Sequence, residues 1–403
     1  MKPRKLKICH VNMFYLPTFG GVEQVMYELA KRQVAEGHEV HVYCCDSDKN
    51  SRIKIKEEII EGVKVHRLPY IIRLSLSTFI WPSLLWQFNN NVKFDIVHSH
   101  VSGHLYILII GILSKLKGFK HIHTTHCPWT DASFRPKILR PFLFLNKLFF
   151  NRISFKLIDK IIPLTPWELE IINKYVNKNY GNNYIKNKEN KEISKIKIIR
   201  NGMDSILFKK IKNNKFKEKH NIKEPFLVLF FGRLNPTKGP EMLAKAAIEI
   251  TKKRKDIAFV WVGPDEGKAE EVQNLIKPYS NMHYLGPIRG KEKVAEMYQA
   301  ADIYVLPSYR EGLPLTLFEA MASGLPIVAS PVNGVPYEMK EPENGFFVNY
   351  GDIENLSKKI IELIDNKKLR QEISINNIKK SVNYDWDIIY KEYMKEYERL
   401  IKK

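Results

Sequence analysis

The sequence has few cysteines, no long hydrophobic run and no stretch that predicts a secretion signal. Its four cysteines in 403 residues have no spacing typical of a disulfide framework or a zinc site, so a reducing intracellular compartment is expected. The longest apolar run, Leu105 to Leu113, is much shorter than the ~20 residues that a bilayer span needs. The opening MKPRKLKICHVNMF has charge followed by only a short apolar run, which predicts a first strand rather than a signal peptide. A cytoplasmic protein is expected, either soluble or held peripherally at the inner face of the cell membrane.

The chain is strongly basic, with 65 Lys and Arg against 44 Asp and Glu, a formal net charge of +21. Such a charge suits nucleic acid, an anionic membrane surface or a phosphate-bearing ligand. Nucleic acid is disfavoured, because no nucleic-acid-binding pattern accompanies the charge. Two stretches, 70–88 and 135–160, mix basic with aromatic residues. They predict either contact with a membrane interface or amphipathic segments that face the core.

Strand-like and helix-like stretches alternate in two successive series. In the first, strands at LKICHVNMF, HEVHVYCC, VKVHRLP, DIVHSH and HIHTTH accompany helices over about 22–36 and 102–117. In the second, strands at PFLVLFFG, IAFVWVG, MHYLG, DIYVLPS, PIVAS and FFVN accompany helices over 240–253, 268–277, 291–300, 353–365 and one from about 314. Strands separated by helices predict right-handed βαβ units on a parallel sheet.

The two series predict an α/β fold with two Rossmann-like, doubly wound domains that face each other across a cleft. The first domain is expected over 1–204 and the second over 205–384. A final amphipathic helix over 385–403 must pack its apolar face on another element. The Asn- and Lys-rich segment 173–195 has no apolar periodicity and is expected to form an exposed loop or insertion.

The stretch Ser308 to Ser330, SYREGLPLTLFEAMASGLPIVAS, predicts a loop, a helix and a buried strand. Pro314 suits the first helical turn and Gly324 suits the residue after the helix. Glu311 then lies in the loop and Glu319 about one turn into the helix, with both carboxylates at the carboxyl edge of the sheet. Backbone N–H groups around Gly312 to Leu315 offer an anion site there. Taken alone, an acidic residue early in a helix is more often explained by the helix dipole.

Three further motifs follow strands, where ligands of such folds bind. Gly20 and Gly21 come after the first strand and would let the backbone approach a pyrophosphate. The full G-x-G-x-x-G fingerprint is missing, which argues against a dehydrogenase. Arg233 and Lys238 lie on the loop FGRLNPTKG, where they could neutralise a diphosphate without a metal. His126 ends the strand-like HIHTTH.

Histidine and aspartate pairs raise the question of a metal. His98 with His100, and His121 with His123, share one face of a strand each, but spacing fixes no third ligand, so packing is the favoured explanation. The D-x-D pairs at 46–48 and 385–387 are interpreted as a loop and a helix N-cap. No metal is expected.

Each of these signals is weak alone, but their order is distinctive. The chain carries GG after the first strand, a histidine at a strand end, NGMD before the second domain, GRL…KG, and REGLPLTLFEAMASGLPIVAS. In this order they resemble the retaining GT-B glycosyltransferases of family 4, the glycosyl transferases group 1. The resemblance covers nearly the whole chain. It implies a GT-B fold whose C-terminal helix crosses back to the first domain.

The resemblance also implies roles for individual residues. Catalytic roles fall to His126, Arg233, Lys238 and Glu311. Arg233 and Lys238 would grip the donor diphosphate, Glu311 the sugar hydroxyls and Glu319 the ribose hydroxyls, while His126 would touch the donor sugar. The diphosphate cradle would be completed by Gly20, Gly21, Gly312, Leu313, Pro314 and Leu315. One departure from the family is that Tyr337 separates Pro336 from Glu338, so Glu338 is given no role.

The implied activity is metal-independent, retaining transfer of a hexose without a cofactor. The donor would be a UDP-, GDP- or ADP-sugar and the acceptor a hydroxyl group of a glycan, a lipid or a lipid-linked sugar. Two alternatives stay open. One is a GT-B sugar-nucleotide epimerase, and the other is a basic, non-catalytic protein that binds membrane or nucleic acid.

Overall fold

The structure is a computed structural model that describes residues 4–18, 20–48, 51–75, 78–88, 92–126, 149–176, 195–211 and 215–402. It divides into two compact units. The first comprises Met1–Arg200 with Ile389–Lys403, and the second comprises Asn201–Ile388. The predicted segments 135–160 and 173–195 lie largely outside the described residues.

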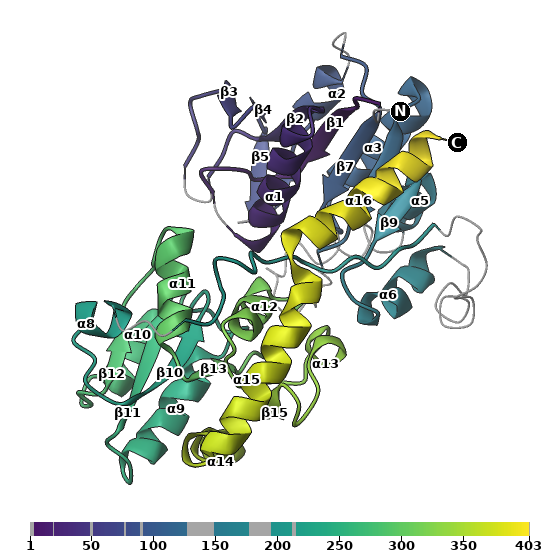
Figure 1. Cartoon of the computed structure of the whole chain (residues 1–403). Helices are drawn as coiled ribbons and strands as arrows, with labels where there is room; N and C mark the ends of the chain where they lie inside the picture. Colours follow the sequence, from purple (N-terminus) through teal and green to yellow (C-terminus); the bar gives the residue numbers. More distant parts are fainter. Residues whose placement is uncertain are drawn as a thin grey trace. The chain divides into compact units, whose positions relative to one another are not determined.

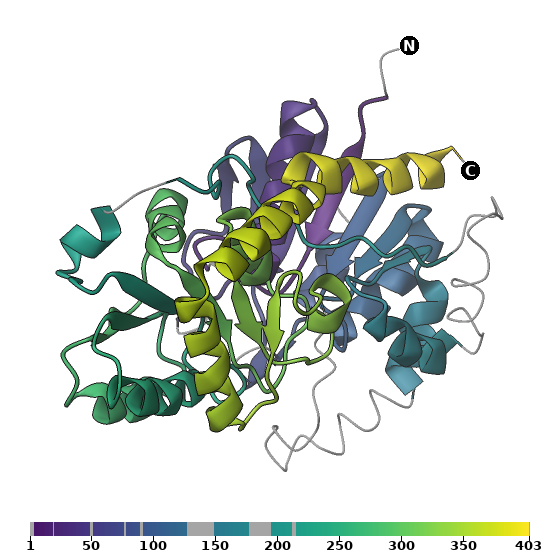
Figure 2. The ribbon, with the colours of Figure 1, turned by 60° about the horizontal axis from the view of Figure 1, so that its bottom comes forward.

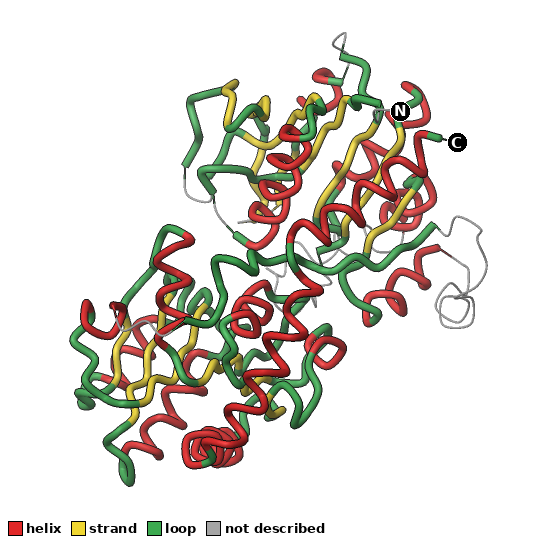
Figure 3. Tube along the Cα trace, viewed as in Figure 1, coloured by secondary structure: helices red, strands yellow, loops and turns green. Residues whose placement is uncertain are grey.

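The first unit is built on a seven-stranded sheet, whose strands are yellow in Figure 3. The strand order is β3-β4-β2-β1-β7-β8-β9, and the strands are parallel except for β3. Its strands are β1 (Lys7–Val11), β2 (Glu39–Cys45), β3 (Glu57–Ile60), β4 (Val63–Leu68), β7 (Ile96–His100), β8 (Lys120–Thr124) and β9 (Lys160–Ile162). The chain direction across the sheet switches between β1 and β7. In doubly wound sheets that switch point is where ligands bind.

Alternation along the strands sends side chains to two separate cores. In β2, Val40, Val42 and Cys44 pack in one cluster with helix α1, whereas Tyr43 and Cys45 pack in the other with helix α3. This is the two-residue period of a strand that is covered on both faces. Among the described residues, the unit also contains α1 (Gly21–Ala35), a hairpin of β5 (Ile72–Ser75) and β6 (Thr78–Ile80), α2 (Ser83–Gln87), α3 (Leu105–Lys117), α5 (Asn151–Leu157) and α6 (Trp167–Val176).

The C-terminal helix α16 (Trp386–Ile401) crosses back to the first unit, as predicted. Its C-terminal half, yellow in Figures 1 and 2, lies on the face of the first sheet that also carries α1. Tyr390 Oη donates to Glu36 at 2.8 Å, and Lys160 Nζ pairs with Glu396 at 2.6 Å in a buried ion pair. The predicted apolar face of this helix is therefore covered by the first unit's sheet.

The second unit is built on a parallel sheet of order β12-β11-β10-β13-β14-β15. Its strands are β10 (Phe226–Phe231), β11 (Ile257–Val262), β12 (Met282–Tyr284), β13 (Ile303–Leu306), β14 (Ile327–Ala329) and β15 (Gly345–Phe347). The central strands are buried on both faces, which explains why they are nearly continuous apolar runs.

The second unit's helices include α15, which the sequence pattern did not predict. They are α8 (Lys215–Lys219), α9 (Pro240–Thr251), α10 (Ala269–Ile276), α11 (Lys291–Ala300), α12 (Leu315–Ala322), α13 (Val335–Glu338), α14 (Ile353–Asp365) and α15 (Lys367–Ser381), followed by a 3₁₀ turn over Val382–Tyr384. Within the described ranges, no helix combines the length and apolarity that a bilayer crossing demands.

Candidate functional site

Two loops meet at the carboxyl edge of the second sheet. One follows β10 and carries Arg233 and Lys238, and the other follows the neighbouring strand β13 and carries Glu311. The backbone N–H groups of Tyr309 and Arg310 donate to Thr237 O at 2.9 and 3.3 Å, which joins the two loops directly. The predicted motifs GRL…KG and REGLP therefore lie side by side.

Glycine is required where these loops approach other backbone. Gly239, which opens α9, has a φ of 61°, and a Cβ there would lie 2.2 Å from Pro307 O. Gly263 has a φ of 148°, and a Cβ there would lie 1.8 Å from Gly232 O. Side chains at these positions would push the loops apart, since real Cβ atoms do not come that close. Glycine at both positions therefore allows the backbone segments to pack closely at this edge.

An ion pair lies at the junction of the two loops. Lys238 Nζ is 2.6 Å from both carboxylate oxygens of Glu311, and Ser308 Oγ donates to Glu311 Oε1 at 2.7 Å. Asn333 Nδ2 donates to the Glu311 carbonyl at 2.5 Å. The Glu311 side chain is only 4% exposed, whereas that of Lys238 is 18% exposed. Glu311 is thus held in a fixed place with its cation on the solvent side.

Arg233 lies on the same loop but has a different partner. Its guanidinium pairs with Glu266 at 2.9 Å, and Asn235 Nδ2 donates to the same carboxylate oxygen at 3.1 Å. About half of the Arg233 side chain is exposed. Because exposed ion pairs contribute little to stability, Arg233 can be diverted to an anionic ligand at small cost.

Helix α12 begins at Leu315, with Pro314 as its N-cap in an extended conformation, so the prediction that Pro314 lies in the first turn was one residue off. The reason is that its ψ of 130° is not helical. Gly324 follows the helix in the left-handed conformation, as predicted. The first N–H groups of a helix have no intrahelical acceptor, so the start of α12, four residues after Glu311, could donate to an anion.

Glu319 lies one turn into α12 and is buried. Tyr298 Oη donates to its Oε2 at 3.1 Å. Burial raises the Glu319 pKa from 4.5 to about 7, and the hydrogen bond from Tyr298 opposes that rise only in part. The two carboxylates of the motif therefore differ, since Glu311 faces a cation and Glu319 faces a phenol.

The other predicted residues lie at the carboxyl edge of the first sheet. Gly20 is the N-cap of α1 and Gly21 its first residue, while His126 follows β8. Gly20 is fully extended, with a φ of −153°, so its backbone does not itself require glycine. His126 has a left-handed φ of 47°, and its Nε2 is 3.0 Å from His100 Nδ1. Burial lowers the His126 pKa to about 3, which keeps the ring neutral.

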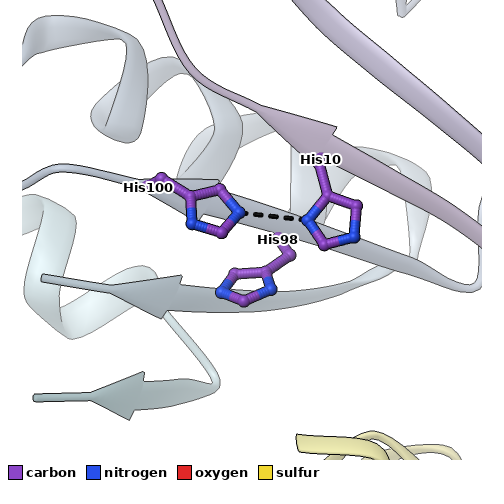
Figure 4. Close-up of side chains that lie close together, drawn as sticks. All are labelled: His10, His98 and His100. Atoms are coloured by element: carbon purple, nitrogen blue, oxygen red, sulfur yellow. Dashed lines mark hydrogen bonds between the residues drawn. The ribbon is translucent and has the colours of Figure 1, made fainter. Parts of the chain in front are cut away.

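Three buried histidines, His10, His98 and His100, gather beneath that edge (Figure 4). One nitrogen from each lies within 4.8 Å of the others, close enough for a common metal ligand set. Both ring nitrogens of each residue already have hydrogen-bond partners, however. Their partners are one another, Gln33, Thr124, His126 and Tyr397. A metal would have to displace those bonds in a site with no carboxylate ligand in the cluster.

Each predicted histidine pair does share one strand face. His98 and His100 stack on each other, and His121 and His123 both bond the Ser99 hydroxyl at 2.8 Å. Their neighbour His10 was not predicted, because it comes from β1 and meets His98 only through the strand register.

The remaining acidic motifs have structural partners. Asp46 pairs with Arg52, and Asp385 accepts from the Asp387 N–H as the predicted N-cap would. Glu338, which received no role, is buried and accepts a hydrogen bond of 2.5 Å from Tyr384 Oη.

Comparison with known families matches both halves of the chain. Residues 19–179 match the family described as Glycosyltransferase Family 4, and residues 212–380 match Glycosyl transferases group 1. Together the two matches cover most of the chain, one on each unit.

Two relatives and a solved structure are similar to this chain over most of its length. An uncharacterized glycosyltransferase of Methanocaldococcus jannaschii is 29% identical over 414 residues, covering 99% of this chain and 100% of that protein. The UDP-Gal:alpha-D-GlcNAc-diphosphoundecaprenol alpha-1,3-galactosyltransferase of Escherichia coli is 26% identical, covering 91% of this chain and 89% of that protein. Among solved structures, the Anabaena HepE protein in complex with UDP has a TM-score of 0.74 at 17% identity, covering 97% and 99% of the two chains. This likeness shows a shared fold.

Proposed function

This chain belongs to the glycosyl transferases group 1 and has the GT-B fold of that family, and we propose that it transfers a hexose from a nucleotide-sugar to a hydroxyl acceptor, without a metal and with retention of configuration. The observation that carries the proposal is the Lys238 and Glu311 pair at the edge of the second sheet, next to the start of α12. It combines a cation for phosphate, a carboxylate for sugar hydroxyls and free helix amides within one small region.

Arg233 and Lys238 would bind the donor diphosphate. Cleavage of the anomeric bond builds negative charge on the leaving diphosphate and positive charge on the sugar. Two cations and the amides that follow Glu311 at Gly312, Leu313 and Leu315 would stabilise the leaving group in the transition state, which is the task a metal performs elsewhere. In this proposal Lys238 exchanges part of its contact with Glu311 for phosphate oxygens.

The carboxylates would hold hydroxyl groups. Glu311 would accept hydrogen bonds from the donor sugar and Glu319 from the ribose, while His126 at the edge of the first sheet would contact the sugar and Gly20 and Gly21 would approach the pyrophosphate. A carboxylate that accepts hydroxyl hydrogen bonds must be ionised to use all its acceptor sites. Since Glu319 has a pKa of about 7, ribose binding would favour its deprotonated form.

Retention follows in this proposal from a front-side path. The leaving phosphate oxygen would take the proton of the acceptor hydroxyl as the new bond forms on the face that the diphosphate leaves. No second carboxylate is then needed as a nucleophile. Measuring the anomeric configuration of the product by NMR tests this directly, since an inverted product would contradict it.

Similar proteins guide the choice of donor and acceptor. HepE was solved in complex with UDP, and the E. coli relative is named for transfer from UDP-Gal to a diphosphoundecaprenol-linked sugar. We therefore place UDP-sugars first among candidate donors, before GDP- and ADP-sugars, and lipid-linked sugars first among acceptors.

A thermal-stability screen with UDP-, GDP- and ADP-sugars tests the donor class. A ligand at about 100 times its Kd stabilises the folded protein by ~2.7 kcal/mol, which raises the unfolding temperature by a few degrees. Arg233→Ala should abolish the shift, whereas Lys252→Ala, at an exposed lysine on another part of the unit, should keep it. Absence of a shift with every donor contradicts the proposal. An epimerised donor without any transfer product would favour the epimerase alternative.

We also propose that the first unit rests on an anionic membrane surface. Ile71, Ile72, Ile80 and Trp86 are exposed on the β5–β6 hairpin and helix α2, and the whole chain is basic. Exposed apolar side chains with surrounding positive charge suit an interface that contains anionic lipid. This location would bring a lipid-linked acceptor to the enzyme.

A further inference from the structure

A row of hydrogen-bonded side chains crosses the first unit and ends at His126. Gln33 Oε1 is 2.8 Å from His10 Nε2, His10 Nδ1 is 3.0 Å from His100 Nε2, and His100 Nδ1 is 3.0 Å from His126 Nε2. Gln33, His10 and His100 are completely buried. Figure 4 shows the bond between the His10 and His100 rings. The row joins helix α1, strands β1 and β7, and the end of β8.

The amide of Gln33 gives the row a direction. Its Nε2 lies 4.0 Å from Met394 Sδ and Gln33 also bonds the Tyr397 hydroxyl, both on α16. With its NH₂ group facing α16, Gln33 has its carbonyl oxygen turned toward His10 and must accept from His10 Nε2–H. A neutral imidazole has one nitrogen that carries a proton and one that accepts a hydrogen bond. Once the protonated nitrogen of the first ring is known, the hydrogen bonds between the rings determine the protonated nitrogen of each ring after it.

The position of the proton on each ring follows from that on the ring before it. His10 carries its proton on Nε2, so its Nδ1 accepts from His100 Nε2–H. His100 Nδ1 in turn accepts from His126 Nε2–H. Within the described residues, Nδ1 of His126 has no hydrogen-bond partner, and the left-handed backbone at this residue holds the ring at the carboxyl edge of the sheet.

We propose that Gln33, His10 and His100 are positioning residues that hold His126 in the Nε2–H tautomer, so that its Nδ1 accepts a hydrogen bond from a hydroxyl group of the donor sugar. The contact of His126 with the donor sugar rests on the proposed function, whereas the tautomer of His126 does not depend on it. It gives His126 the chemistry of an acceptor for a neutral hydroxyl. A phosphate or carboxylate oxygen would instead be repelled by the Nδ1 lone pair.

Burial keeps the whole row neutral, which the one-way pattern requires. It lowers the pKa of His10 to about 4 and that of His126 to about 3, and it also lowers the pKa of His100 well below the ordinary value. An added proton would give a ring two N–H groups and reverse or break the row.

Long-range ¹H–¹⁵N correlation spectra of the full-length protein with ¹⁵N-labelled histidine rings test the tautomer. His126→Gln identifies the His126 signals by their loss. We expect pyrrole-type Nε2 and pyridine-type Nδ1 for His126 in the unliganded protein. A pyrrole-type Nδ1, or equal shifts for both nitrogens, would overturn the proposal without bearing on whether the chain is a transferase.

Gln33→Met keeps the side-chain volume and removes the acceptor at the far end of the row. We expect mixed tautomers at His126 and a fall in kcat of about 10- to 100-fold, the size expected when a reacting-centre contact is misplaced. Binding of free UDP, which has no sugar, should change less than twofold. His121→Asn is the matched control, because His121 is equally buried on β8 but bonds Ser99, outside the row.

These experiments test the positioning role of the row separately from the contact of His126 with the donor sugar. Unchanged tautomer and unchanged kcat in Gln33→Met contradict the positioning role. A correct tautomer in the wild-type protein together with full transfer activity in His126→Gln contradicts the contact with the sugar, since the row would then exist without serving the reaction. An equal kcat loss in His121→Asn would also count against the row, because it would point to a general disturbance of the sheet.

Discussion

At the scale of single residues, burial gives two glutamates of one motif different chemistry. Glu311 and Glu319 are eight positions apart and both are acidic residues near a helix start. Lys238 and Ser308 bind the first, whereas the second is enclosed and has Tyr298 as its hydrogen-bond donor. The proposed roles, sugar hydroxyls for one and ribose hydroxyls for the other, follow from this difference in surroundings.

Glu319 should make the stability of the protein depend on pH. Its pKa in the folded protein is about 7 against 4.5 for an ordinary glutamate, so the folded state binds more protons between these values. The contribution of Glu319 to the free energy of unfolding should therefore fall as the pH rises from about 4.5 to about 7, by up to ~3 kcal/mol. The buried histidines act in the opposite direction, because burial lowers their pKa values. In urea unfolding measured at pH 5 and pH 8, the change in the free energy of unfolding should therefore be more positive for Glu319→Gln than for the wild type.

The matched control is Glu249→Gln, since Glu249 is exposed on α9 and pairs with its exposed neighbour Lys252. That variant should show the same change in the free energy of unfolding between the two pH values as the wild type. A Glu319→Gln protein whose change equals that of the wild type would contradict the assignment.

Lys238→Ala should reduce kcat/KM for the donor by about 100-fold or more, because a charge-assisted contact to the leaving diphosphate is removed in a partly buried site. The variant also leaves the buried Glu311 without its cation, so circular dichroism and thermal unfolding must accompany the kinetics. Lys252→Ala provides the comparison, since its lysine is exposed. Equal kinetics in the two variants would be incompatible with a role for Lys238 in the transition state.

At the scale of elements, helices with strong apolar periodicity could be predicted from the sequence, whereas a helix with weak periodicity was missed. The boundaries of α11 and α14 were predicted to the residue, because charged and apolar positions alternate there at helical spacing. α15 was missed because its sequence KKLRQEISINNIKKS has few apolar residues and no continuous apolar stripe. Its fold depends on tertiary contacts, including Asn377 Nδ2 donating to Leu325 O at 2.7 Å.

The candidate site was predictable to different degrees in the two units. Arg233, Lys238 and Glu311 could be brought together from the sequence, since their loops follow strands of one parallel sheet. The partnership of His10 with His98 and His100 could not, because it depends on which strand lies beside β1 and in what register. The same holds for Gln33, whose contact with His10 requires the docking angle of α1.

The buried ion pair of α16 should be critical for that helix. The Lys160 and Glu396 side chains are 3% and 2% exposed. Glu396→Ala removes the carboxylate partner of a buried ammonium group and should destabilise the first unit by ~3–5 kcal/mol. The double change Lys160→Met with Glu396→Leu replaces both charges by apolar groups and should recover most of that loss. Denaturant unfolding followed by tryptophan fluorescence measures both, and a double variant as unstable as the single one would contradict this account.

At the scale of the whole molecule, the basic and aromatic stretch 70–88 packs some of its apolar side chains into the core and exposes others. Phe79, Trp81, Leu84 and Phe88 are buried in the core of the first unit, whereas Ile71, Ile72, Ile80 and Trp86 are exposed. One segment therefore contributes to packing on one side and leaves apolar groups on the other. The periodicity of the sequence alone does not show which apolar side chains are buried and which are exposed, since both faces carry large apolar residues.

Membrane binding should accordingly depend on both Trp86 and charge. We expect co-sedimentation with vesicles that contain anionic lipid, weaker binding to purely zwitterionic vesicles, and loss of binding at high salt, because the surface attraction is screened over about 10 Å at 0.1 M salt. Trp86→Asp should lower vesicle binding several-fold. Ile375→Asp is its control, because Ile375 in the second unit is exposed to a similar extent, 66% against 64% for Trp86. Equal loss in both variants would mean that net charge alone drives binding, and competition by duplex DNA with no effect of Trp86→Asp would favour the non-catalytic, polyanion-binding alternative.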